Sequence, residues 1–173
     1  MEERIGAHEP ATPASAPAEA QDVTILLAED DRGHAELIRI QLREVGLRNP
    51  VARLRDGQAA WDFLAGAGPE PHRDPSHAYV LLLDLHMPKI DGVELLRRIK
   101  AERALATLPV IILSTTDNPV EKAECAHLGC THFLTKPLDF ARFAEALAAL
   151  GFSLAICTVS AGRPAPELAR AHA

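Results

Sequence analysis

Four segments of this chain place a reactive side chain directly after an apolar run. Glu29 and Asp30 follow the first run, Asp84 follows the second, Ser114 ends the third and Lys136 follows the fourth. Carboxylates that lie close together repel one another and are driven towards the neutral form unless a cation neutralises them. Mg²⁺ favours a few carboxylates, water and a phosphate oxygen as ligands. With an ammonium and a hydroxyl group added, these side chains suit the transfer of a phosphoryl group to an oxygen nucleophile.

The apolar runs themselves predict short strands. They cover residues 23–28, 79–83, 109–114 and 131–135, and a further strand is expected at 51–55, where VARLR alternates between apolar and charged residues. Short strands that are apolar throughout are typical of a parallel sheet with helices on both faces. Such a sheet carries its functional groups at the carboxyl ends of its strands, so this pattern brings the reactive side chains together.

Helices are expected between these strands. The first has an apolar stripe through Leu37, Ile38, Gln41, Leu42 and Val45, and Gly46 ends it. The others are expected at 59–64, after Asp91–Gly92, from Asn118–Pro119 to Gly129, and after Asp139, where Phe140, Phe143, Leu147 and Leu150 share one face. The segment at 66–77, dense in glycine and proline, is expected to be a surface loop.

Composition restricts the class of protein. With 173 residues and 47% hydrophobic residues, the chain suits one compact domain with tails. A formal net charge of −6 without a basic run argues against a nucleic-acid surface. Three cysteines, Cys125, Cys130 and Cys157, lack C-x-x-C spacing and are interpreted as buried or idle thiols. No apolar run is long enough to span a membrane and no secretion signal is evident, so a soluble cytoplasmic protein is expected.

The strand ends and their neighbours form four motifs. They read ILLAEDD at 25–31, LLLDLHMPKIDG at 81–92, VIILST at 110–115 and FLTKP at 133–137. In this order and spacing, the sequence resembles the receiver domain of two-component response regulators over residues 22–150. The resemblance implies one α/β domain, with a flavodoxin-like, doubly wound parallel sheet of five strands in the order 2-1-3-4-5 and five helices. It also implies a signalling module, not a conventional enzyme, that accepts a phosphoryl group from a sensor histidine kinase.

The same resemblance assigns a role to each motif residue. Asp84 resembles the phosphoacceptor; Asp30 resembles a direct Mg²⁺ ligand, Glu29 the second acid, and the backbone carbonyl of His86 a third protein ligand. Mn²⁺ is expected to substitute for Mg²⁺. Lys136 resembles the phosphate-binding lysine, in a cis peptide bond with Pro137. Ser114 resembles the switch hydroxyl, Phe133 the switch aromatic, and Thr115 the residue whose backbone N–H contacts the phosphoryl group.

Simpler interpretations exist for some of these residues. Glu29 and Asp30 could cap the following helix, although Asp31 can fill that role, and Asp91 and Asp139 are interpreted as caps or turn formers. Phe133 is equally compatible with a half-buried aromatic that has no switching role. The His86 imidazole either tunes loss of the phosphoryl group or points into solvent.

Two features exceed a minimal receiver. The loop at 66–77 is long, and residues 152–160 resume an apolar, β-branched pattern after Gly151. With RDGQAAWDFLAG at 55–66 and VIILSTTDN at 110–118, the loop resembles small stand-alone regulators paired with bacterial phytochromes, which would make the kinase a bacteriophytochrome. Residues 1–21 are expected to be a flexible tail. Residues 152–173 are expected to be an arm that reaches across a homodimer, or else a tail that folds back or stays disordered.

Three other functions fit the sequence less well than phosphoacceptance. A receiver that binds partners without phosphorylation is disfavoured by the complete set of motif residues. A phosphohydrolase with an aspartate nucleophile needs a second aspartate two positions later, where His86 stands. A nucleotide-binding domain needs a glycine-rich turn after the first strand, where AEDDRGH stands.

Overall fold

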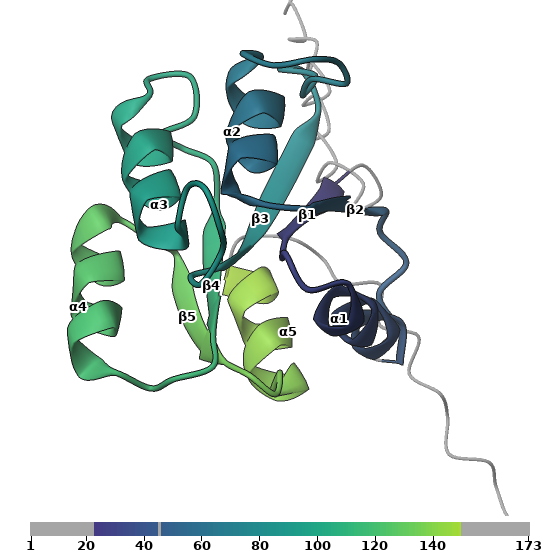
Figure 1. Ribbon diagram of the computed structural model, residues 1–173. Coiled ribbons are helices and arrows are strands. Elements are labelled where there is room, and N and C mark those ends of the chain that lie inside the picture. Colours follow the sequence, from purple (N-terminus) through teal and green to yellow (C-terminus); the bar gives the residue numbers. More distant parts are fainter. Residues whose placement is uncertain (1–22, 45, 150–173) are drawn as a thin grey trace, which may run out of the picture.

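The computed structural model describes residues 23–44 and 46–149, in which strands and helices alternate (Figure 1). The strands are β1 (Val23–Ala28), β2 (Val51–Leu54), β3 (Ala78–Asp84), β4 (Val110–Ser114) and β5 (His132–Thr135). The helices are α1 (Arg32–Glu44), α2 (Gly57–Ala65), α3 (Gly92–Ala101), α4 (Pro119–Leu128) and α5 (Phe140–Ala149). The expected strands are therefore correct to within one residue at each end.

The five strands form one parallel sheet in the order β2-β1-β3-β4-β5. Helices α1 and α5 cover one face, and α2, α3 and α4 cover the other (Figure 1). This arrangement confirms the predicted flavodoxin-like fold. The register pairs Ala28 with Leu83 and Ser114 with Thr135, so the residues that follow these strands emerge at the same edge of the sheet.

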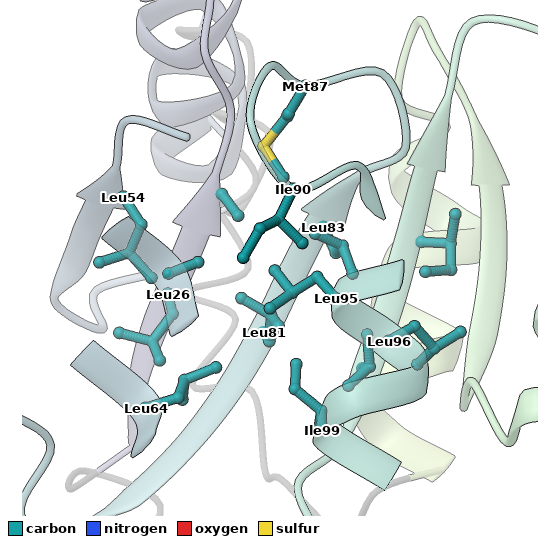
Figure 2. Packing of buried hydrophobic residues seen from close by; sticks show 14 of the residues in the cluster. Leu26, Leu54, Leu64, Leu81, Leu83, Met87, Ile90, Leu95, Leu96 and Ile99 are labelled. Atoms are coloured by element: carbon teal, nitrogen blue, oxygen red, sulfur yellow. The ribbon is translucent and has the colours of Figure 1, made fainter. Parts of the chain in front are cut away.

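Alternate residues of the central strands face opposite layers of helices. On β3, Leu81 and Leu83 pack in one cluster with α2 and α3, whereas Val80 and Leu82 pack in the other with α1 and α5. Figure 2 shows the first cluster, in which Leu95, Leu96 and Ile99 of α3 lie against the sheet. Both faces of each central strand are therefore buried, which explains why these strands are apolar at successive positions.

Helix α1 differs from the prediction in the face that it buries. Ala35, Ile38 and Leu42 are the buried residues of α1, whereas Leu37 is 51% exposed. The predicted stripe was therefore wrong at Leu37, because Ala35, a small residue with a weak hydrophobic signal, occupies the position that faces the sheet. Gly46 ends the helix as predicted, with φ of 84° and its N–H donated to the Arg43 carbonyl at 2.9 Å.

Helix α2 begins two residues earlier than predicted. The Asp56 carboxylate accepts the Ala59 N–H at 2.8 Å, so it caps the helix and Gly57 becomes its first residue. The predicted caps Asp91 and Asn118 are confirmed, since each side chain accepts a backbone N–H of the first turn of α3 or α4. The Asp139 side chain likewise accepts the Ala141 N–H at 2.9 Å, at the start of α5.

Two cysteines lie in the described part of the chain, and both are free thiols. Cys125 is buried on α4, and burial raises the pKa of its thiol to about 11. Burial also raises the pKa of the half-buried Cys130. Both thiols are therefore neutral near pH 7 and poorly reactive, which agrees with the interpretation as idle cysteines.

Several predictions concern residues outside the described ranges. They are the N-terminal tail at 1–21, the arm at 152–173 with the homodimer that depends on it, the thiol of Cys157, and the placement of Val45 and Leu150. The side chains of Phe140 and Leu147 are also outside the described part of α5. Among residues 23–44 and 46–149, no helix combines the length and apolar character needed to cross a membrane.

Candidate functional site

The predicted acidic site lies at the carboxyl ends of β1 and β3. Glu29, Asp30 and Asp84 each place a carboxylate oxygen within 4.8 Å of the others. Glu29 is fully buried and Asp84 is 5% exposed, whereas Asp30 is exposed. Hard oxygen donors grouped at this spacing, with one side open to solvent, suit Mg²⁺ or Mn²⁺, which keep several water ligands.

Lys136 joins the two buried carboxylates. Its Nζ donates to Glu29 Oε2 at 2.5 Å and to Asp84 Oδ2 at 3.0 Å. Although burial lowers the pKa of the ammonium, the contacts with Glu29 and Asp84 outweigh burial and raise it, so Lys136 stays charged near neutral pH. The peptide bond between Lys136 and Pro137 is cis, as the resemblance implied.

Glu29 is the most deeply buried of the three acids. Burial raises the pKa of its carboxyl group, and the negative charge of Asp84 acts in the same direction, while the Lys136 ammonium opposes both. Its Oε1 also accepts the Asp31 N–H at 3.2 Å. A divalent cation beside Glu29 would favour the ionised form in the same way as the ammonium does.

The acids at the end of β1 have separate tasks. The Asp31 side chain accepts the His34 N–H at 2.7 Å and so caps α1, which leaves Glu29 and Asp30 free of that role. The backbone of these two residues is held by Arg53 of β2. Its guanidinium donates to the carbonyl of Glu29 at 3.0 Å and to that of Asp30 at 2.5 Å.

Arg53 was missed in the sequence. The alternating pattern of VARLR indicates a strand and says nothing about where the guanidinium points. The available signal was a charged residue on a strand next to β1, paired with Leu27, two residues before the acidic run begins. Its two contacts indicate that Arg53 positions the loop that carries Glu29 and Asp30, and that it does so without using their carboxylates.

The loop between β3 and α3 is held close to the phosphoacceptor candidate. The Gly92 N–H donates to the Leu85 carbonyl at 2.9 Å, and the His86 N–H lies 3.3 Å from Asp84 Oδ1. A Cβ on Gly92 would lie 2.4 Å from the Asp84 carbonyl oxygen, closer than real Cβ contacts allow. Glycine at this position therefore lets α3 begin directly against the end of β3.

The loop between β3 and α3 is also held by Asp56, the residue that caps α2. Lys89, with φ of 69°, donates from its Nζ to the Asp56 carboxylate at 2.6 Å. Burial of the Asp56 carboxyl raises its pKa, but the Lys89 ammonium and the Ala59 N–H outweigh burial, so the net pKa is lowered. Met87 and Ile90 of this loop turn into the core (Figure 2). The loop is thus fixed at both its polar and its apolar residues.

The structure also places the remaining predicted site residues. Ser114 is fully buried at the end of β4, and its carbonyl accepts the Lys136 N–H at 2.7 Å. Thr115 is exposed beside it, and the His86 side chain is exposed as well. Phe133 is half-buried on β5, with the Lys122 ammonium 5.9 Å from the centre of its ring. The roles of these four residues, and of the His86 carbonyl as a metal ligand, stay predictions.

Comparison with known proteins identifies the family. The family model of the response regulator receiver domain matches residues 25–148, so this chain belongs to that family. The chain is 39% identical over 128 residues to the probable methanogenesis regulatory protein FilR2 of Methanothrix harundinacea. That match covers 70% of this chain and 77% of the relative.

Solved structures of response regulators have the same fold. The bacteriophytochrome response regulator RtBRR is 32% identical with a TM-score of 0.68, and the match covers 84% of this chain and 85% of that one. The Mn²⁺-bound form of response regulator Rcp1, a protein of Synechocystis sp., is 31% identical with a TM-score of 0.60. In this case the match covers 78% of this chain and 96% of that one.

Proposed function

We propose that this chain accepts a phosphoryl group on Asp84 from a sensor histidine kinase, in a reaction that depends on a divalent cation. The observation that carries the proposal is the placement of the Lys136 ammonium within hydrogen-bond distance of Asp84 and Glu29, with Asp30 beside them. The Mn²⁺-bound form of Rcp1 supports a divalent cation at this acidic group. Glu29, Asp30, Asp84 and the His86 carbonyl would hold it.

In the transfer, a carboxylate oxygen of Asp84 attacks phosphorus and forms an O–P bond. The P–N bond of the kinase phosphohistidine breaks, and its electron pair returns to the imidazole of the kinase. Lys136 offsets charge on the phosphoryl oxygens, which is the main form of catalysis available for phosphoryl transfer. A bound Mg²⁺ would supply further neutralisation of the charge on the phosphoryl group. Ser114 and the Thr115 N–H would donate hydrogen bonds to the acyl phosphate.

The kinase that the chain serves is proposed more specifically to be a bacteriophytochrome. The support is the likeness to RtBRR together with the long loop at 66–77. Output through a downstream protein, a homodimer and a cytoplasmic location belong to the same proposal. The homodimer rests on the sequence pattern at 152–160 alone.

The test uses a phosphodonor that needs no kinase. Wild type and Asp84→Asn are incubated with acetyl phosphate and Mg²⁺, or with Mg²⁺ chelated by EDTA, and intact mass is measured. We expect wild type to gain one phosphoryl group with Mg²⁺ and none with EDTA, and Asp84→Asn to gain none. A phosphoryl group that persists on Asp84→Asn would refute the assignment of Asp84. Phosphotransfer from candidate kinases, bacteriophytochromes included, then tests the choice of partner.

Two alternative functions predict different results in this experiment. A receiver that signals without phosphorylation would gain no mass under any condition. An aspartate-nucleophile phosphohydrolase would turn over acetyl phosphate continuously with a short-lived intermediate. Position 86 carries an exposed histidine where such an enzyme needs an acid/base aspartate.

A further inference from the structure

The buried Ser114 hydroxyl is part of a chain of polar contacts that leads to α4. Ser114 Oγ accepts the Thr116 N–H at 3.1 Å and lies 3.5 Å from Thr116 Oγ1. Thr116 Oγ1 in turn donates to Glu121 Oε2 at 3.2 Å. Glu121 belongs to the first turn of α4, so three polar groups connect the end of β4 with this helix.

The direction of this chain follows from the number of available protons. A threonine hydroxyl carries one hydrogen, and an ionised carboxylate can only accept. Because Thr116 gives its hydrogen to Glu121, a hydrogen bond across the 3.5 Å between the two hydroxyl oxygens would have Ser114 as its donor. Ser114 is fully buried, so its hydrogen needs an acceptor inside the protein. Thr116 Oγ1 is the acceptor that this arrangement offers to the Ser114 hydrogen, the same hydrogen that Ser114 would offer to a phosphoryl group.

We propose that Thr116 and Glu121 are positioning residues that hold the Ser114 hydroxyl away from Asp84 until a phosphoryl group competes for it. The inference rests on the proposed function of Asp84 and adds a regulatory contact to it. When the aspartate is phosphorylated, Ser114 turns to the acyl phosphate and no longer contacts Thr116, which weakens the link between the end of β4 and Glu121 in the first turn of α4. The same contact therefore opposes phosphorylation and reports it to α4.

A matched control lies one turn further along the same helix. Glu124 also lines α4 and carries the same charge, but its carboxylate accepts from Arg97 at 3.2 Å. Replacing Glu124 by alanine changes the charge of α4 by the same amount as Glu121→Ala without touching Thr116. If the change of charge alone alters the affinity for a phosphoryl mimic, both variants will show it. If the release of Ser114 alters that affinity, Glu121→Ala alone will show it.

The experiment measures the affinity for beryllofluoride, a phosphoryl mimic, by calorimetry at saturating Mg²⁺. Variants are Thr116→Val, Glu121→Ala, Thr116→Ser and Glu124→Ala. Loss of one hydrogen bond that competes with binding is expected to tighten the affinity about fivefold in Thr116→Val and Glu121→Ala. Thr116→Ser keeps the hydroxyl and should bind like wild type, as should Glu124→Ala.

A second measurement tests the contact without any phosphoryl mimic. In the amide NMR spectrum of the unmodified protein, Glu121→Ala should shift the Thr116 N–H signal and Glu124→Ala should leave it in place. An unmoved Thr116 signal, unchanged affinity in Thr116→Val and Glu121→Ala, or an equal rise in Glu124→Ala would overturn the inference. If wild type binds beryllofluoride while these variants match it, the inference fails and the proposed function stands. If wild type shows no Mg²⁺-dependent binding, the proposed function fails first.

Discussion

Lys136 places one positive charge between two buried carboxylates, and methionine can replace it with a side chain of similar length and no charge. The side chains of Lys136, Glu29 and Asp84 are 13%, 1% and 8% exposed, so water can replace the ammonium only poorly. We expect Lys136→Met to lower the free energy of unfolding by about 3 kcal/mol at pH 7 without divalent cations. Breaking a buried ion pair by removing one partner typically has an effect of this size.

Two estimates from the geometry agree with this magnitude. Carboxylate oxygens of Glu29 and Asp84 lie within 4.8 Å, and two unit charges at that distance repel by about 3.5 kcal/mol at an effective dielectric constant of about 20. Alternatively, Glu29 takes up a proton. From its ordinary pKa of 4.5, protonation at pH 7 costs about 3.4 kcal/mol. Burial already raises this pKa, so the cost lies below that value.

The assay is urea unfolding of wild type and Lys136→Met in EDTA and at saturating Mg²⁺. Because a cation bound to the native state replaces the missing positive charge, the loss should shrink to about 1 kcal/mol with Mg²⁺. Lys122→Met serves as the control, since Lys122 is exposed and lies 3.8 Å from an exposed Asp117 carboxylate. That pair should contribute about 0.5 kcal/mol or less.

The result that would refute the reasoning is an equal loss of stability in EDTA and in Mg²⁺. It would mean that the two carboxylates do not depend on a counter-charge at this position. The destabilisation would then come from packing of the lysine stem, and the cation would bind elsewhere or not at all.

Three further predictions test the surroundings of the site. Gly92→Ala places a methyl group 2.4 Å from the Asp84 carbonyl oxygen, so unfolding experiments should show a loss of about 1–3 kcal/mol and calorimetry weaker Mg²⁺ binding; unchanged values for both would contradict the close approach. Asp56→Ala removes a helix cap and the partner of Lys89, with an expected loss of about 2–3 kcal/mol at pH 7. Folding lowers the pKa of Asp56, so its contribution to the free energy of unfolding is present above the ordinary pKa of 3.8 and is lost as the pH falls through the lower folded pKa. A stability difference between wild type and Asp56→Ala that stayed the same at every pH would be inconsistent with the ion pair. His86→Asn should leave the half-life of the phosphorylated protein unchanged, because the imidazole is exposed; an altered half-life in a decay assay would show that it takes part in the hydrolysis.

The strands and the acidic group were predictable because their signals are local and strong. Each strand is a short apolar run with an obvious end, and parallel strands deliver their ends to one edge of the sheet. The sequence alone therefore predicts that Asp84 and Glu29 lie close together. The order of the strands came from the resemblance to receiver domains, since periodicity alone does not distinguish between the possible orders.

The parts that sequence did not predict depend on contacts across the fold. Leu37 looks like a core residue on α1, but the helix turns so that Ala35 faces the sheet and Leu37 stays exposed. Arg53 donates hydrogen bonds to the backbone carbonyls of Glu29 and Asp30, and nothing in the sequence of β2 indicates this contact. The contact from Ser114 through Thr116 to α4 likewise depends on side-chain orientation.

The ammonium contacts at the site join residues that are far apart in the chain. Lys136 lies 107 residues from Glu29 and 52 from Asp84, so the charge arrives only when β5 has joined a sheet that already contains β1 and β3. Bringing such distant residues together costs conformational entropy, and a partly folded chain has not yet formed these contacts. A folding intermediate with β5 undocked would present Asp84 without its positive neighbour. If Asp84 is the phosphoacceptor, as proposed, its site is complete only once β5 has joined the sheet.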